Sequence, residues 1–396
     1  MKILMLLPYA FLKQSGSSLS TYYRIKALVD LGNQVDVLAF PFGQAVDIGK
    51  GKIIRCARVP FINKLESGSV IPKIPLSLSM LVKCIRILKN SKYDLLYTHG
   101  TSGLIGMFMK AFYKLPLIQE MHGLWEYEII KWNFYPNKIV SWFAALLENL
   151  IIRNSDAIVT TCRNITDKVI KVSKGKSIFT IENAAEEINS NHNKVNIRKL
   201  REKYGINNQK IIMYTGSFLK IQNIDWLIEC SASLTKTEKN VMCFLIGGSH
   251  DQVIETQRAV ALRGLSDHFI ILESRSKEEV VHLLNLTDIL VSPRTIGIEI
   301  PLKIITYLQS GKAIVATNCP IHSQILNDKV ALLTEPNIDG FLRGIQELLH
   351  NEEMRLRLGI NAKKTYMKMY SYKAYKNKME NLCLYLMKGS VKLNTS

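Results

Sequence analysis

Short apolar runs alternate along the chain with longer segments whose apolar residues recur every three to four positions. The first pattern predicts buried parallel strands and the second predicts amphipathic helices. In the first half, the expected strands are residues 3–7, 35–40, 94–98, 116–121, 157–161 and 177–181, and the expected helices are residues 19–31, 76–90, 104–113 and 138–153. Such alternation predicts a doubly wound α/β domain, a parallel sheet with helices on both faces.

A polar segment at residues 189–208, rich in asparagine and ending in RKLREKYG, separates this pattern from a second one. Strand-like runs then recur at residues 211–215, 242–246, 269–272, 289–291 and 313–317. We therefore expect two Rossmann-like domains, at residues 1–188 and 205–369. Residues 370–388 are amphipathic, basic and aromatic, so we expect a closing helix within about residues 370–396. A length of 396 residues suits two domains.

The composition is that of a globular protein, with 47% hydrophobic and 21% charged residues. The seven cysteines are scattered and form no C-x-x-C pair, which argues against a disulfide framework or a zinc site and favours a cytoplasmic location. The opening MKILMLLPYAF favours a first strand over a signal peptide. Glu148 and Asn149 interrupt the most apolar later stretch, residues 139–152, which is too short to cross a bilayer.

The net charge of +19 requires an anionic partner. The basic residues are dispersed and no nucleic-acid-binding motif is present, so we expect no nucleic acid and favour a membrane surface together with an anionic substrate. Aromatic residues and lysines interleave in FMKAFYK, residues 108–114, and in IKWNFYPNKIVSW, residues 130–142. Both a peripheral membrane surface and buried helix faces remain open as interpretations. The sequence implies no particular oligomeric state.

Three glycine-containing loops follow expected strands, where ligands of open parallel sheets bind. Gly16 lies among serines before the first helix, Gly216 and Ser217 lie in YTGSFLK with Lys220 close by, and Gly247 lies in LIGGSHD. Small residues there let backbone N–H groups approach a phosphate or a sugar. None of the loops has the spacing of a dinucleotide-binding or Walker motif, so ordinary turns remain an alternative.

The segment VSPRTIGIEIPLKIITYLQSGKAIVATN, residues 291–318, resembles the donor-binding region of the retaining glycosyltransferases of family 4, which have the GT-B fold. The similarity extends along nearly the whole chain. It includes the G-S-S loop after the first strand, YDLLYTH, EMHG, SDAIVT, IENA and YTGS followed by DWLIE, all in matching order and spacing.

This resemblance implies two doubly wound domains facing each other across a cleft, with a C-terminal helix that crosses back to the N-terminal domain. The N-terminal domain would bind the acceptor and the C-terminal domain a nucleotide diphosphate sugar. It also implies transfer with retention of anomeric configuration, no cofactor and no obligatory metal. A glycan or lipid-linked acceptor of cell-envelope or surface-glycan biosynthesis, met at the inner membrane face, would follow.

The resemblance also implies roles for individual residues. His122 matches a histidine that lies over the donor sugar, and a histidine bonded to backbone at a strand end is the alternative. Gly16 matches the loop facing the diphosphate. Lys303, Arg294 and Arg275 match basic donor-site positions, although the lysine can equally be solvated and the arginines paired with carboxylates. Ile304 and Thr306 fall at nucleotide-contacting positions.

The sequence departs from the family pattern at several of these positions. The two glutamates of the family's E-x7-E pair fall at Ile298 and Thr306, and Glu299 is one place off. The arginine and lysine that usually follow the domain-two glycine fall at Ser217 and Gln222, so Lys220 or Lys303 would have to supply the charge. A catalytically degenerate binding subunit and a nucleotide-sugar epimerase therefore remain alternatives to an active transferase.

Other catalytic constellations have weaker support. The eight histidines are dispersed, without an H-x-x-x-H or D-x-D sequence, so we expect no metal site. Glu126 and Glu128 follow His122 closely, and either can act as a base on the acceptor hydroxyl or be a solvated surface residue.

Overall fold

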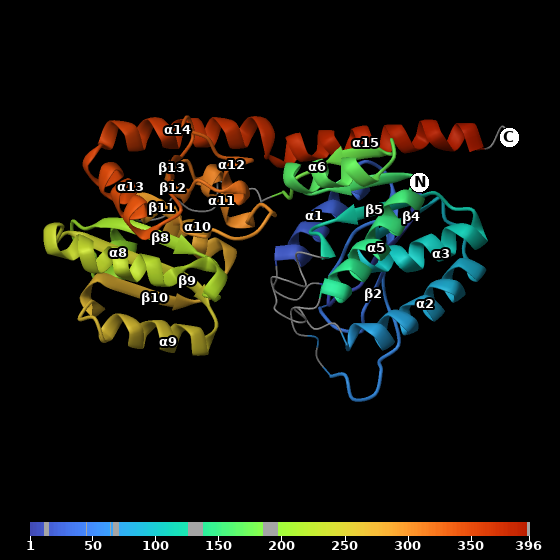
Figure 1. The fold of residues 1–396 in the computed structure, drawn as a ribbon, viewed down its shortest axis with the longest axis horizontal. Helices are drawn as coiled ribbons and strands as arrows, with labels where there is room; N and C mark the ends of the chain where they lie inside the picture. The colour runs from blue at the N-terminus through green and yellow to red at the C-terminus, as the bar shows by residue number, and fades with distance from the viewer. Residues whose placement is uncertain are drawn as a thin grey trace. The chain divides into compact units, whose positions relative to one another are not determined.

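A computed structural model describes residues 1–11, 16–44, 46–63, 65, 71–125, 138–184 and 197–393 of the chain. The chain forms two compact units. Unit 1 consists of Met1–Ala184 and Tyr375–Ser396, and unit 2 consists of Ala185–Ala374 (Figure 1).

Unit 1 contains a seven-stranded parallel sheet in the order β3-β2-β1-β4-β5-β6-β7. The strands are β1 (Lys2–Leu7), β2 (Gln34–Ala39), β3 (Ile53–Arg55), β4 (Leu95–His99), β5 (Leu117–Met121), β6 (Ala157–Thr160) and β7 (Ser177–Thr180). The chain winds outward from β1 in one direction and from β4 in the other. The carboxyl ends of β1 and β4 therefore form the switch point at which ligands of open sheets bind.

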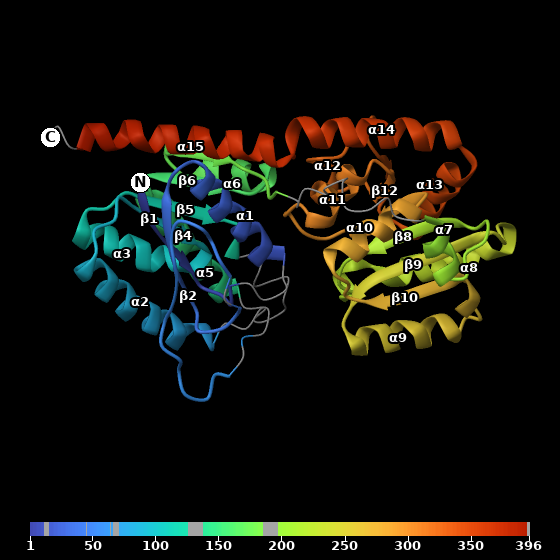
Figure 2. The same ribbon diagram turned by 180° about the vertical axis from the view of Figure 1, so that it is seen from behind.

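Helices cover both faces of this sheet, as Figures 1 and 2 show. They are α1 (Gly16–Asp30), α2 (Lys73–Asn90), α3 (Gly103–Tyr113), α5 (Lys138–Asn154), α6 (Arg163–Val172) and α15 (Tyr372–Leu393), with the 3-10 turn η1 (Gly100–Ser102) before α3. α2, α3 and α5 form the layer on one face, where Leu4, Leu6 and Leu96 join the hydrophobic core beneath α2 and α3. α1, α6 and α15 lie on the other face.

Unit 2 contains a six-stranded parallel sheet in the order β10-β9-β8-β11-β12-β13. Its strands are β8 (Lys210–Thr215), β9 (Val241–Gly248), β10 (Phe269–Glu273), β11 (Ile289–Ser292), β12 (Ala313–Thr317) and β13 (Leu332–Thr334). Its helices are α7 (Ile197–Lys203), α8 (Ile224–Thr237), α9 (His250–Ala261), α10 (Lys277–Leu286), α11 (Leu302–Ser310), α12 (Pro320–Ser323), α13 (Ile338–His350) and α14 (Glu352–Met369), with 3-10 turns η2 (Lys220–Gln222) and η3 (Ser266–His268). The switch point of this sheet lies between β8 and β11.

The expected strands are present, and the structure adds elements that the apolar pattern did not predict. β3 and β13 are three-residue edge strands, too short to show a period. α6 was missed because its sequence RNITDKVIKV is mostly polar, with Ile165 and Val169 as its buried residues. Within the expected linker at residues 189–208, residues 197–203 form helix α7, and Leu200 and Tyr204 pack against the core of unit 2.

The C-terminal helix completes unit 1, which confirms the expected crossing back of the chain. α14 belongs to unit 2, whereas α15 belongs to unit 1 from Tyr375 onward. The Met379 sulfur accepts a hydrogen bond from Arg24 of α1 at 3.1 Å. The Arg24 guanidinium also lies over the Tyr375 ring, 5.2 Å from its centroid. α15 is therefore part of the buried interior around Arg24.

All seven cysteines are buried as free thiols. In the described part of the chain, no helix combines the length and the apolar character that crossing a membrane requires.

Candidate functional site

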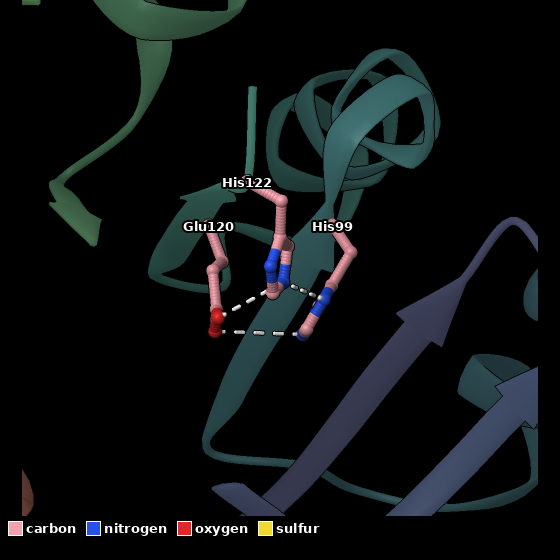
Figure 3. Close-up of side chains that lie close together, drawn as sticks. All are labelled: His99, Glu120 and His122. Atoms are coloured by element: carbon pink, nitrogen blue, oxygen red, sulfur yellow. Dashed lines mark hydrogen bonds and ion pairs between the residues drawn. The ribbon is translucent and has the colours of Figure 1, made fainter. Parts of the chain in front are cut away.

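Two histidines and a glutamate meet at the carboxyl edge of the unit 1 sheet (Figure 3). His99 is the last residue of β4, Glu120 lies in the neighbouring strand β5, and His122 follows the end of β5. The His122 Nε2 atom lies 3.1 Å from Glu120 Oε1 and 3.2 Å from His99 Nδ1. The two imidazole rings stack with their centroids 5.2 Å apart. Only His122, whose side chain is 25% exposed, reaches solvent, so it is the member of the cluster that can touch a ligand.

Glu120 is held ionised in the interior of unit 1 by Arg24. The Arg24 Nη2 atom donates to Glu120 Oε1 at 2.9 Å, and Tyr97 donates its hydroxyl proton to Oε2. Burial alone would raise the pKa of Glu120, but Arg24 and then the two histidines outweigh it and hold that pKa well below its usual range. Glu120 is therefore a fixed negative charge behind His122 rather than a group that exchanges protons with a substrate.

His99 links this cluster to the switch point between β1 and β4. Burial lowers the pKa of His99 to about 3, so its ring is neutral at physiological pH. Its Nδ1 atom lies 3.4 Å from the hydroxyl of Tyr9, which follows β1. The Tyr9 hydroxyl also shares a hydrogen bond of 2.6 Å with Thr21 of α1. Gly16 is the first residue of that helix, which places this predicted diphosphate-facing residue on the element tied to the cluster.

Spacing along the sequence did not indicate that two histidines cluster, and here the structure differs from the expectation of dispersed histidines. Ligand atoms of His99, Glu120 and His122 lie within 4.8 Å of one another, close enough to surround a metal ion. However, the Glu120 carboxylate already binds Arg24, and a guanidinium at that position opposes the approach of a second cation. The residues fit an ion pair better than a metal, and the absence of an obligatory metal stays a prediction.

In unit 2, the two predicted glycine turns lie against each other at the carboxyl ends of β8 and β9. Gly216 and Gly247 have φ angles of +136° and +119°, which favour glycine. A Cβ atom on Gly247 would lie 2.6 Å from the carbonyl oxygen of Gly216. Gly247 thus permits close approach of the two backbones, and it fixes the turn that carries Gly216 and Ser217 beside the switch point.

Lys303 lies in α11, which connects β11 to β12, and its side chain reaches this turn. Its Nζ atom donates to Gln222 Oε1 at 3.0 Å and lies 3.9 Å from the centroid of the Tyr214 ring. The Nζ atom would also lie 3.7 Å from a Cβ atom on Gly216. Burial, and then the positive charge of Arg294, lower the pKa of Lys303 well below its usual range. Lys303 and Arg294 therefore repel each other electrostatically at the switch point of unit 2.

Arg294 lies two residues after the end of β11, and its positive charge acts on Lys303. It is buried, and its Nε atom donates to the carbonyl oxygen of Ile296 at 2.7 Å. A Cβ atom on Gly297, whose φ is +128°, would lie 2.4 Å from the Arg294 guanidinium. The loop between β11 and α11 is thus folded around this arginine, whose charge acts on Lys303. The donor-site role that the family resemblance implies for both residues stays a prediction.

Among the described residues, the other predicted donor-site side chains form no hydrogen bond or ion pair with Lys303 or the Gly216 turn. Lys220 is exposed in η2, and Arg275 is exposed between β10 and α10. Thr306 is half-buried on α11. Ile304 is completely buried in the hydrophobic core of unit 2, so its side chain packs the domain and only its backbone remains available for a ligand. Of the candidate bases, Glu126 and Glu128 lie outside the described residues.

Sequence reasoning missed a buried histidine in unit 2. The His322 Nε2 atom lies 2.9 Å from Ser292 Oγ, and its Nδ1 atom lies 2.9 Å from the carbonyl oxygen of Thr317. Burial lowers the pKa of His322 to about 3. The signal available in the sequence was its position just after the fifth strand-like run of the second domain.

Comparisons with known proteins cover both units. The family profile described as glycosyl transferases group 1 matches residues 196–365, and that of glycosyltransferase family 4 matches residues 15–186. Over 275 residues the chain is 20% identical to alpha-D-kanosaminyltransferase of Streptomyces kanamyceticus, covering 66% of this chain and 69% of the relative.

Solved structures of glycosyltransferases share the fold of the whole chain. Sucrose-phosphate synthase from Thermosynechococcus elongatus matches with a TM-score of 0.80 at 15% identity, over 98% of this chain and 100% of that one. Anabaena HepE, solved in complex with UDP-glucose, matches with a TM-score of 0.74 at 17% identity, over 97% and 99% of the two chains. These neighbours and the two parallel sheets together establish a GT-B fold.

Proposed function

This chain belongs to the group 1 glycosyltransferases of family 4, and we propose that it transfers a sugar from a nucleotide diphosphate sugar, with retention of configuration, to a glycan or lipid-linked acceptor of the cell envelope. Its class as a glycosyltransferase follows from the family. The donor, the acceptor and the stereochemistry are the proposal. The observation that carries it is the placement of Lys303 beside the Gly216 turn, at the switch point of unit 2.

The diphosphate of the donor would bind at this turn. Lys303 donates to Gln222, a position at which the family resemblance implies a lysine, so its ammonium group supplies the cation that the local sequence lacks. The like charge of Arg294 disfavours protonation of Lys303, and an anion bound beside both cations would remove that penalty. The backbone at Gly216 adds N–H groups that no side chain obstructs. Lys303 and Arg294 together would also stabilise the charge that develops on the departing diphosphate.

The nucleoside would lie farther along α11. The family resemblance implies a ribose contact at Thr306, where one hydroxyl replaces the carboxylate of a glutamate. Weaker ribose recognition would follow, which leaves the diphosphate contacts as the main source of donor affinity. Anabaena HepE has been solved with UDP-glucose, which makes UDP sugars the first donors to test.

His122 would contact the transferred sugar from unit 1. The Glu120 carboxylate accepts a hydrogen bond from the His122 ring or forms an ion pair with it. This contact fixes the orientation of the ring. Glu120 is unsuited to act as a base because it is buried and its pKa is depressed. Glu120 therefore does not supply the base that inversion needs, and the retention we propose rests on the family resemblance. In the proposed step the bond from the anomeric carbon to phosphate breaks, the bond to the acceptor oxygen forms, and the acceptor proton passes to the departing phosphate oxygen.

The acceptor and its location follow from charge. A net charge of +19 attracts anionic surfaces, and acceptors on anionic lipid would be concentrated near the enzyme. We therefore place the reaction at the inner membrane face, with the enzyme bound peripherally.

A donor panel tests the proposal directly. The full-length protein is incubated with UDP, GDP and ADP sugars, with and without membrane extracts as acceptor, and release of free sugar and of nucleotide is measured. One nucleotide class should be turned over, and the anomeric configuration of the product, read by NMR, should match that of the donor. His122→Ala should reduce turnover while leaving the affinity for the nucleoside diphosphate unchanged, because the nucleotide binds unit 2.

Three outcomes would contradict the proposal. Nucleotide binding without release of sugar from any donor would indicate a binding subunit. An isomerised nucleotide sugar formed without an acceptor would indicate an epimerase. A product of inverted configuration would exclude retention.

A further inference from the structure

The three helices on one face of the unit 1 sheet each turn a row of apolar side chains toward solvent. The rows are Ile74, Leu78 and Val82 on α2, Phe108 and Phe112 on α3, and Ile139, Trp142, Phe143, Leu146 and Leu150 on α5, and all are exposed. α2 packs against α3, and α3 packs against α5, so the three helices that carry these rows form one layer (Figure 1). We call these ten residues the apolar outer face.

This exposure is too concentrated to be ordinary surface scatter. Trp142 is 65% exposed, Phe112 is 67% exposed and Ile139 is 72% exposed. Single exposed apolar residues are common on soluble proteins, but a contiguous apolar patch marks a contact with a partner or a membrane. The aromatic residues here are of the kind that inserts between headgroups, with an apolar ring and, in Trp142, a polar N–H group.

The charges on these helices have one sign at the surface. Each apolar row ends at an exposed cation, with Arg86 and Lys89 on α2, Lys114 after α3, and Arg153 on α5. The helices connect parallel strands and run in the same direction, so these cations gather at one edge of the layer. Within the three described helices the acidic residue is Glu148, which is buried and accepts a hydrogen bond from the Trp125 backbone N–H at 3.2 Å.

The helices on the opposite face of the same sheet differ. α1 contains Asp30, α6 contains Asp167 and α15 contains Glu380, all of which are part-buried or exposed. The described residues of α2, α3 and α5 therefore combine apolar rows with cations and include no exposed carboxylate. Asp94 and Asp156 follow shortly after α2 and α5, and Asp156 is paired with Lys110 of α3.

We propose that the apolar outer face is a docking surface for an anionic lipid bilayer, with the three helices lying along the membrane plane. The apolar rows would enter the boundary between headgroups and acyl chains, and the cations at the edge would contact lipid phosphates. This extends the proposed function, because a lipid-linked acceptor would then be met at the surface that holds the enzyme.

A second copy of the chain fits this surface less well. A symmetric dimer through the same patch would bring two sets of cations together, without an exposed carboxylate on these helices to neutralise them. An anionic bilayer supplies the opposite charge over the whole patch, which is why the charge pattern selects a membrane.

Vesicle binding tests the proposal without any substrate. The full-length protein is sedimented with vesicles of phosphatidylcholine alone or mixed with phosphatidylglycerol. We expect at least tenfold tighter binding to the mixed vesicles, weakened by salt, because the four cations at the edge of the layer are attracted to the anionic surface.

Matched variants separate the two parts of the surface. The double variant W142S/F143S should lose at least tenfold in affinity for mixed vesicles, and R86Q/K89Q/R153Q should lose the preference for mixed over neutral vesicles. L262S/L356S is the control, because both leucines are exposed on unit 2, Leu262 at 87%. Its binding should equal that of the unchanged protein. Thermal unfolding of each variant confirms that these exposed substitutions leave the fold intact.

Unchanged vesicle binding by W142S/F143S, or absent binding by the unchanged protein, overturns the proposal. Self-association in sedimentation equilibrium that W142S/F143S abolishes also overturns it, in favour of a dimer. Sugar release from the soluble donor in the absence of vesicles distinguishes failure of the docking proposal from failure of the proposed transferase reaction. If that activity persists while vesicle binding fails, the docking surface is wrong and the proposed transferase reaction stands.

Discussion

Arg24 and Glu120 form an ion pair of 2.9 Å in which the two side chains are 0% and 1% exposed. The pair lies directly behind His122, whose Nε2 atom is 3.1 Å from Glu120. A buried ion pair contributes little net stability, but removing one partner leaves an uncompensated charge in the interior. The pair therefore holds His122 in place. Removing either partner would strongly reduce the free energy of unfolding.

Glu120→Gln should lower kcat for sugar transfer by about 10- to 100-fold with little change in KM for the donor, because the variant disturbs the position of His122 and leaves the nucleotide contacts of unit 2 intact. Steady-state kinetics measure both parameters. The same substitution should reduce the free energy of unfolding by about 3–5 kcal/mol, because Arg24 loses its counter-charge.

The double variant Arg24→Met with Glu120→Gln is the control for this stability loss. Removing both charges should restore much of the free energy of unfolding, while kcat stays low. A kcat that recovers together with the stability would mean that Glu120 acts only in folding.

Lys303→Met should weaken binding of the preferred nucleoside diphosphate by about tenfold, the loss of one charge-assisted contact. Methionine keeps the apolar stem that packs near Tyr214. Isothermal titration calorimetry measures the affinity. Lys220→Met, in the exposed η2 turn, is the matched control and should bind nearly normally. The opposite ranking of the two variants would assign the phosphate contact to Lys220.

Gly247→Ala should lower both nucleoside diphosphate affinity and stability, because its Cβ atom would lie 2.6 Å from the Gly216 carbonyl oxygen. Gly264→Ala separates the clash from the cost of backbone conformation. Gly264 also has a positive φ, +67°, but its Cβ atom would meet nothing within 4 Å. That control should lose about 1 kcal/mol of unfolding free energy and keep its affinity. Equal affinities in the two variants would show that the paired turns do not shape the site.

Stability should fall as pH decreases from 7 to 5. Burial lowers the pKa of His99 and of His322 to about 3 from an ordinary 6.5. The unfolded chain therefore takes up protons in this range and the folded chain does not, so stability is fully present above pH 6.5 and lost below it. Each histidine contributes a loss of about 2 kcal/mol between pH 7 and pH 5. Urea unfolding at both pH values measures the loss, and His99→Gln should reduce it. A free energy independent of pH would contradict the neutral burial of these rings.

Chelation should leave sugar transfer unchanged. Arg24 already binds the carboxylate that a metal at His99, Glu120 and His122 would need. The assay compares activity before and after dialysis against EDTA. An activity that disappears and returns with a divalent cation would contradict this prediction.

Much of the fold was predictable because buried parallel strands are short apolar runs. The polar helix α6 and the three-residue strands β3 and β13 were not predictable, since their place depends on contacts with neighbouring strands. The same distinction applies to the site. Gly216, Gly247 and His122 stand out in the sequence because each lies at or just after the carboxyl end of a strand.

The partners of the site residues could not be predicted from neighbouring positions in the sequence, because they lie far away along the chain. Arg24 meets Glu120 across 96 positions, and Lys303 meets Gln222 across 81 positions. In the sequence, Arg24 resembles any other cation on an amphipathic helix, and only the fold shows that it is buried. The available signal was the carboxylate of Glu120 within the strand-like run PLIQEM, because a charge inside a buried strand requires a counter-charge.

The packing of α15 against Arg24 has a consequence for biosynthesis. Translation produces residues 1–184 of unit 1 first, but Tyr375 and Met379 are made only after the whole of unit 2. Until then the guanidinium of Arg24 lacks part of its enclosure. Unit 1 therefore completes its interior only after unit 2 has been made, and a nascent chain stalled before α15 would carry an unfinished histidine cluster.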